Sequence, residues 1–163
     1  MAASTYKKAL VRRFDRSTLP GTVNPAGYVQ AEGIELLSLE GDVQVIPYPD
    51  VRAVYFVRDF NEPLPERQVF QNRPKMSGLW VSLRFRDGEV MEGMIPNNLM
   101  AVESAGFTLI PPDPYGNAQR VFVPRSALLG IEVLGVVGSP LRKRKPKEAP
   151  RGQIGLFDQP AEP

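Results

Sequence analysis

The sequence predicts an all-β protein built from two tandem five-stranded barrels and followed by a disordered tail. Three observations predict this fold: apolar and polar residues alternate along short segments, glycine and proline recur between them, and the first half of the chain resembles the second. Alternation with a period of two is typical of strands that bury one face. We therefore expect a first barrel at residues 6–58, a linker at 59–77, a second barrel at 78–138 and a tail at 139–163.

An internal repeat relates the two barrels. The aligned pairs occur in the same order in both halves: Arg13-Phe14 with Arg84-Phe85, Gly21 with Gly93, Gly33 with Gly106 and Pro47 with Pro124. After that proline, three apolar positions keep identical spacing: Val51, Val54 and Val57 in the first half, and Leu128, Ile131 and Leu134 in the second. A whole series of matches in one order indicates duplication of a single unit.

The elements of each unit follow from local patterns. "GIELLSLEGDVQVIPY" predicts a hairpin that turns at residues 40–42, and "VSLRFRDGEVMEGMI" predicts another at Asp87-Gly88, where the glycine supplies the positive φ of a tight turn. "PDVRAV" and "RSALLGI" each predict one helical turn before the fifth strand. The linker holds three prolines, and we expect Val69 and Phe70 to hold it against a barrel.

This order of features resembles the small SH3-like barrels, Sm-like proteins among them, and "WVSLRFRDGEVMEGMI" carries the resemblance most closely. The paired units also resemble an uncharacterised bacterial family of tandem small barrels. The Sm-like resemblance implies RNA binding through an Asp and an Asn in the loop after the second strand, with a basic residue before the last strand. Here that loop reads "IPNNLMA", with Asn97 and Asn98 but no acidic residue, and Arg125 is the basic candidate.

The composition excludes several kinds of chemistry. The chain has no cysteine and no histidine, so it has no disulfide, no thiolate nucleophile and no imidazole base or metal ligand. No spacing of acidic residues is diagnostic of a metal site or of acid–base catalysis. We therefore predict a protein that is not an enzyme, with no catalytic residue, metal or cofactor. The sequence shows no long apolar run and no secretory signal, which predicts a cytoplasmic protein without a membrane partner.

Positive charge is concentrated in the tail. Residues 1–140 hold 14 basic and 15 acidic side chains, a net charge of −1, whereas residues 141–163 hold six basic and three acidic side chains, a net charge of +3. The residues predicted to contact DNA phosphates, without sequence preference, are Arg142, Lys143, Arg144, Lys145 and Lys147. If the barrels themselves bound nucleic acid, the first residues to test would be Arg73, Lys75, Arg120 and Arg125.

The tail also carries "QIGLF" at residues 153–157. This stretch resembles the pentapeptide with which many bacterial DNA polymerases, mismatch-repair proteins and replication regulators bind the sliding clamp. The pattern requires Gln first, Leu or a similar residue fourth and Phe fifth, with an aliphatic second residue common. Gln153, Ile154, Leu156 and Phe157 match it, and Gly155 stands at a tolerant position. The resemblance implies a protein partner, the sliding clamp.

The sequence thus predicts a non-enzymatic, DNA-associated adaptor that docks on the sliding clamp through its tail. One alternative is a regulatory or scaffold module, in which the barrels bind a protein or a small ligand and the tail packs on a barrel of its own chain. Another alternative is an Sm-like RNA-binding protein, which the net charge of −1 on the body does not favour.

Overall fold

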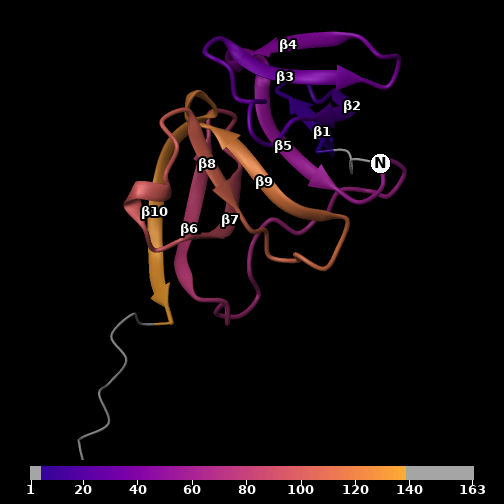
Figure 1. The fold of residues 1–163 in the computed structure, drawn as a ribbon. Helices are drawn as coiled ribbons and strands as arrows, with labels where there is room; N and C mark the ends of the chain where they lie inside the picture. The colour runs from indigo at the N-terminus through magenta and orange to yellow at the C-terminus, as the bar shows by residue number, and fades with distance from the viewer. Residues whose placement is uncertain (1–4, 139–163) are drawn as a thin grey trace, which may run out of the picture.

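The computed structural model describes residues 5–138, and the predicted all-β fold is confirmed there (Figure 1). The strands of the first half are β1 (Lys7–Arg13), β2 (Thr18–Val23), β3 (Gly33–Ser38), β4 (Val43–Pro47) and β5 (Val51–Val57). Those of the second half are β6 (Gly78–Phe85), β7 (Val90–Ile95), β8 (Gly106–Leu109), β9 (Ala118–Pro124) and β10 (Leu128–Val137). Three 3₁₀ turns complete the elements: η1 (Tyr48–Asp50), η2 (Leu99–Ala101) and η3 (Arg125–Ala127). The predicted helical turn before each fifth strand is therefore confirmed.

The ten strands of these residues form two sheets. The larger sheet has the order β4-β3-β2-β1-β5-β9-β8, and the smaller one has the order β10-β6-β7. A single bridge between Met94 and Ile110 connects β7 to β8. When this bridge is counted, the second half has the order β9-β8-β7-β6-β10, which matches the order β4-β3-β2-β1-β5 of the first half.

The two closed barrels expected from the sequence are not seen, because both sheets are open. Two features account for the opening. The ladder between β2 and β3 holds only two residue pairs, and β7 meets β8 at one bridge. In addition, β9 pairs along its length with β5 of the other half, as Figure 1 shows. The halves are therefore joined through a shared sheet.

One pair of aligned glycines shows that the two halves bend in the same way. A Cβ on Gly21 would lie 2.7 Å from Leu36 Cγ, and a Cβ on Gly93 would lie 2.4 Å from Leu109 Cδ1. Leu36 is in β3 and Leu109 is in the equivalent strand β8. Only a residue without a side chain lets the second strand pass this close to the third.

The alignment of Arg13-Phe14 with Arg84-Phe85 is wrong by one residue. Val11 pairs with Val54 in the first half, and Leu83 pairs with Ile131 in the second, which places Arg13 opposite Phe85 in the repeat. The hairpins agree, because the Arg13 N–H donates to the Ser17 carbonyl and the Phe85 N–H donates to the Glu89 carbonyl. The repeated Arg-Phe dipeptide is thus a coincidence of sequence, whereas the alignment of Val54 with Ile131 is confirmed.

The corrected alignment also explains an unusual residue in the first hairpin. Gly88 has a φ of 87°, as predicted, and its equivalent is Arg16, which has a φ of 71°. The turn is held by Asp15, whose Oδ1 accepts hydrogen bonds from the Ser17 N–H and the Ser17 hydroxyl at 2.8 and 2.5 Å. A side chain in this left-handed region costs roughly 1–2 kcal/mol relative to the ordinary helical region.

We expect Arg16→Gly to raise the free energy of unfolding by about 1 kcal/mol, because glycine adopts a positive φ without steric cost but loses more entropy on folding. Urea unfolding followed by circular dichroism measures the change. Arg16→Ala is the matched control, since it removes the same charge and keeps the Cβ. An equal gain in both variants would show that charge, and not backbone conformation, is responsible.

Two hydrophobic cores fill the molecule, and each takes residues from both halves. The larger core combines Leu10 and Tyr55 of the first half with strand residues of the second, such as Phe85. The smaller core lies in the first half but includes Phe122 of β9. Residues 6–58 and 78–138, which the sequence predicts as two barrels, therefore share both hydrophobic cores.

Arg52 strengthens the junction between the halves. Its side chain is buried and its guanidinium lies over the Phe85 ring, 4.1 Å from the centroid. The same guanidinium donates to Asp87 Oδ2 at 3.0 Å and to Glu89 Oε2. Burial opposes ionisation of Asp87, but hydrogen bonds from the Glu89 N–H and from Arg52 outweigh it, and together they lower the pKa of Asp87.

The linker is fastened at both of its ends. Near its C-terminal end, Glu92 Oε2 accepts from the Phe70 N–H and from Trp80 Nε1, both at 3.0 Å, and the two rings meet edge to face. Phe70 thus holds the linker as predicted, whereas the Val69 side chain is exposed. At its start, the buried side chain of Asn117 forms four hydrogen bonds with the backbone of residues 58–62.

None of the described residues belongs to a helix with the length and apolarity that a membrane span requires.

Candidate functional site

A loop of the first half places an aromatic side chain at the junction of the two halves. The Asn24 carbonyl accepts from the backbone N–H of Gly27 and of Tyr28 at 3.0 and 2.9 Å, so the "NPAGY" segment forms a tight turn. This turn directs the Tyr28 ring edge-on against Phe56 of β5 and Phe122 of β9, with centroid separations of 5.4 and 5.6 Å. Tyr28 therefore packs against strands of both halves.

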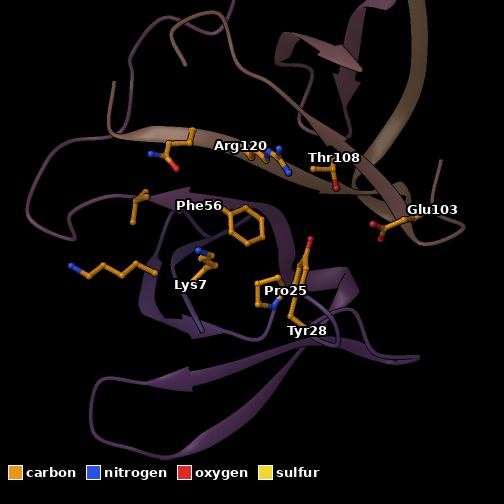
Figure 2. A pocket seen from close by; sticks show the side chains of 10 residues that line it. Lys7, Pro25, Tyr28, Phe56, Glu103, Thr108 and Arg120 are labelled. Carbon is orange, nitrogen blue, oxygen red and sulfur yellow. The ribbon is translucent and has the colours of Figure 1, made fainter. Parts of the chain in front are cut away.

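Beside Tyr28 lies a cleft of about 490 Å³ between the two halves (Figure 2). The first half contributes Lys7, Lys8, Pro25, Tyr28, Phe56 and Val57, and the second half contributes Glu103, Thr108, Gln119 and Arg120. In Figure 2, Arg120, Thr108 and Glu103 lie on one side and face Lys7, Pro25, Tyr28 and Phe56 on the other. Because β5 and β9 pair directly, the cleft opens over the seam of the shared sheet.

The charges of the cleft favour an anion. Three lining residues are cationic and one, Glu103, is anionic. Lys8 Nζ donates to the Arg58 carbonyl at 3.3 Å and lies over the Phe60 ring, so this cation also holds the start of the linker. Lys7 and Arg120 have exposed side chains at the rim. They are the cations best placed to meet a ligand.

Tyr28 contributes a hydroxyl group that stays protonated. Burial raises the pKa of Tyr28 well above its ordinary value, and the nearby Glu103 carboxylate raises it further. At neutral pH the side chain therefore keeps its proton and can donate a hydrogen bond. The lining combines aromatic rings, a hydroxyl donor and cations, which is suited to binding more than to chemistry.

The cleft continues as a groove along the junction. A second hollow of about 410 Å³ lies between residues 25–29 and residues 103–105, and a third of about 430 Å³ lies between residues 29–31 and residues 104–105. Tyr48 lines the third hollow, and its hydroxyl donates to the Gln30 carbonyl. The groove therefore follows the loop of the first half that carries Tyr28.

The site residues predicted in the tail all lie outside the described residues: Arg142, Lys143, Arg144, Lys145, Lys147, Gln153, Ile154, Leu156 and Phe157. Among the basic residues named for the barrels, Arg120 lines the cleft, whereas Arg73 and Arg125 bind backbone. Arg73 Nη2 donates to the Val136 carbonyl at 3.0 Å, and Arg125 Nε donates to the Ser104 carbonyl at 3.2 Å.

Sequence reasoning missed Tyr28 and Phe56 as site residues. The available signal was the Asn-Pro-Ala-Gly turn, which places an aromatic residue directly after a tight reversal of the chain.

Within residues 5–138, no cluster of three or more acidic side chains could hold a metal ion.

Comparison with known protein families matches residues 5–135 to a family of unknown function (DUF6982). No curated protein and no solved structure matches the sequence.

Proposed function

The chain belongs to the DUF6982 family, and we propose that it is a non-enzymatic cytoplasmic adaptor, with two duplicated SH3-like units, that binds the bacterial sliding clamp through residues 153–157. The observation that carries the proposal is the "QIGLF" pentapeptide, placed 15 residues beyond the described body and preceded by a basic, proline-containing stretch. The uncharacterised family matched here is consistent with the resemblance to an uncharacterised family of small β proteins.

The physical chemistry of the pentapeptide supports this function. Leu156 and Phe157 are large apolar residues, which suit insertion into a hydrophobic pocket, and Gln153 can hydrogen-bond at the pocket rim. A short peptide that orders on binding loses conformational entropy, so a single copy binds weakly and reversibly.

The proposal is tested with an isolated peptide covering residues 152–159. Fluorescence anisotropy of the labelled peptide, titrated with purified bacterial sliding clamp, should give a saturable curve that unlabelled peptide reverses. A peptide of the same composition in scrambled order is the control and should not bind. A flat titration for the native order would refute clamp binding.

We expect any DNA affinity of the full chain to come from the basic stretch at residues 142–147. Its five cations would release counterions from the phosphates, so log affinity should fall by about 0.7–0.9 per log unit of salt for each phosphate neutralised. Replacing all five with glutamine should remove binding to a duplex of arbitrary sequence, as measured by anisotropy at several salt concentrations. Lys7→Gln with Arg120→Gln is the control on the body and should leave the DNA affinity unchanged. Tight or sequence-selective binding by the tail variant would instead locate the DNA site on the strands.

A second candidate function, a ligand-binding regulatory module, is favoured by the cleft between the halves. Lys7 and Arg120 offer cations beside the Tyr28 and Phe56 rings, a combination that suits a small molecule with an apolar ring and an anionic group. Adenosine monophosphate serves as a probe of that chemistry.

For this second candidate, Arg120→Gln should weaken the probe's affinity about tenfold, since charge-assisted hydrogen bonds are roughly twice as strong as neutral ones. Isothermal titration calorimetry of the full chain measures the change. Arg84→Gln, which removes an exposed arginine of β6 away from the cleft, is the matched control. Equal affinities in the two variants would show that the probe does not bind at the cleft.

A further inference from the structure

The pairing of β5 with β9 provides a template for contacts between molecules. In this antiparallel ladder Val54 lies opposite Phe122, Tyr55 opposite Val121 and Phe56 opposite Arg120. The β5–β9 ladder joins the fifth strand of the first half to the fourth strand of the second. Val54 and Phe122 are both fully buried, through this ladder and the adjoining cores.

Within residues 5–138, the equivalent strands at the other ends of the repeat have no such partner. In the part of the chain that the structure describes, β4 pairs only with β3, and β10 pairs only with β6. These strands are the fourth strand of the first half and the fifth strand of the second. Figure 1 draws β4 at the top of the molecule and β10 along its left side.

The equivalence can be stated residue by residue, because Pro47 and Pro124 precede the 3₁₀ turns η1 and η3 at the same position. Counting from these prolines, Val45 corresponds to Phe122 and Ile131 corresponds to Val54. The internal register, transferred to the outer strands, sets Val45 opposite Ile131, Gln44 opposite Glu132 and Val43 opposite Val133.

These outer strands expose apolar side chains where their equivalents are buried. Val45 is 48% exposed and Ile131 is 41% exposed, whereas Phe122 and Val54 are both 0% exposed. Val43 and Val133 are exposed as well, and so are Leu129 and Leu134 of β10. An apolar strand with an unpaired edge is a template for pairing with another chain.

The backbone of β4 is also arranged for such pairing. The Ser38 N–H donates to the Asp42 carbonyl and the Tyr48 N–H donates to the Glu32 carbonyl, one residue to either side of β4. The bonded pairs of an antiparallel ladder alternate, so Gln44 and Ile46 of β4 are the residues bonded to β3. In an antiparallel ladder the residues between them, Val43 and Val45, direct their N–H and C=O groups to the other side. That side is the outer edge.

We propose that the occupant of these edges is a second copy of the chain, with β4 of one molecule paired to β10 of the next in the register of the β5–β9 ladder. Pairing of β10 with itself in register would place Glu132 opposite Glu132, which is destabilising, whereas the proposed register sets Glu132 opposite the neutral Gln44. The contact is head to tail, so each molecule offers one edge of each kind and association continues until a ring closes. It does not require the tail.

Three variants of the full chain test the proposal. The first blocks β4 with Val43→Lys and Val45→Lys, and the second blocks β10 with Ile131→Lys and Val133→Lys. The control, Leu99→Lys with Met100→Lys, adds the same charge at exposed apolar positions of η2, which belongs to neither strand. Sedimentation velocity over a dilution series measures the mass, and far-UV circular dichroism checks the fold.

The wild type and the control should form species larger than the 18.1 kDa monomer that dissociate on dilution. Each blocked variant should raise the dissociation constant at least about tenfold, because lysine on an edge strand opposes pairing. A mixture of the two blocked variants should form a dimer and nothing larger, since β10 of the first and β4 of the second are both intact. This outcome is specific to head-to-tail pairing, and it also shows that the variants are folded.

Several results would overturn the proposal. One is a monomeric wild type at every concentration up to the solubility limit. Another is a blocked variant that associates as well as the wild type, or a mixture that stays monomeric. A fourth variant, with alanine at Gln153, Leu156 and Phe157, tests whether the tail covers an edge in its own chain. Association that appears only in this variant would show that the tail, and not a second copy, is the occupant.

Discussion

If the chain is the proposed clamp adaptor, replacing Gln153, Leu156 and Phe157 together by alanine should abolish binding of the full chain to the sliding clamp. Truncation of a true anchor residue costs about 2 kcal/mol or more, so the loss of the two apolar anchors alone lowers the affinity roughly a thousandfold. Removal of Gln153 adds the loss of a hydrogen bond at the pocket rim. Biolayer interferometry with immobilised clamp measures the change directly.

Gly155→Ser is the matched control for this experiment. It changes a tolerant position of the pentapeptide, and it should leave the affinity within a few-fold of the wild type. If the triple variant still bound the clamp, the match to the pentapeptide would be accidental and the contact would lie elsewhere on the chain.

Asn117→Ala should lower the free energy of unfolding by about 3 kcal/mol, because it removes four hydrogen bonds between a buried side chain and the backbone, at about 0.5–1.5 kcal/mol net each. Asn117 Oδ1 accepts from the N–H groups of Arg58 and Asp59 at 3.0 and 2.9 Å. Its Nδ2 donates to the carbonyls of Asp59 and Glu62 at 2.8 and 3.0 Å. One side chain therefore satisfies four backbone groups at the point where the chain leaves β5 for the linker.

Urea unfolding monitored by tryptophan fluorescence measures this loss, since Trp80 is the single tryptophan of the chain. Asn97→Ala, which removes an exposed asparagine from the loop after β7, is the control and should change stability by less than about 0.5 kcal/mol. A loss below about 1 kcal/mol for Asn117→Ala would mean that water replaces the side chain at these backbone groups.

The local elements of this fold could be predicted from the sequence because single residues specify them. Gly41 and Gly88 have positive φ values of 96° and 87°, at the two turns that the sequence indicated. Pro47 and Pro124 stand before the two 3₁₀ turns. Alternation of apolar and polar residues then predicted strands.

The joining of the halves could not be predicted in the same way. Periodicity tells which face of a strand is buried, but it does not tell which strand lies at its edge. The β5–β9 ladder joins residues more than 60 positions apart, and it replaces closure of each half as a separate barrel. The cleft with Tyr28 and Arg120 depends on that ladder, so it could not be predicted from either half alone.

The tail residues were predicted from a pentapeptide pattern, which is local, and their binding to the clamp stays a prediction. Whether the motif acts on another protein or on its own chain depends on surfaces that a local pattern does not contain. The apolar side chains on β4 and β10 make this question concrete, since they are among the exposed apolar groups that a tail packed on its own chain would cover.

Hydrogen–deuterium exchange of the full chain, with and without the sliding clamp, tests the adaptor function most directly. The account predicts that a peptide covering residues 152–159 exchanges rapidly in the free protein and becomes protected when clamp is added, while the strands of residues 5–138 keep their protection. Slow exchange of residues 152–159 in the free protein, unchanged by clamp, would contradict it and would show that the tail packs on its own chain.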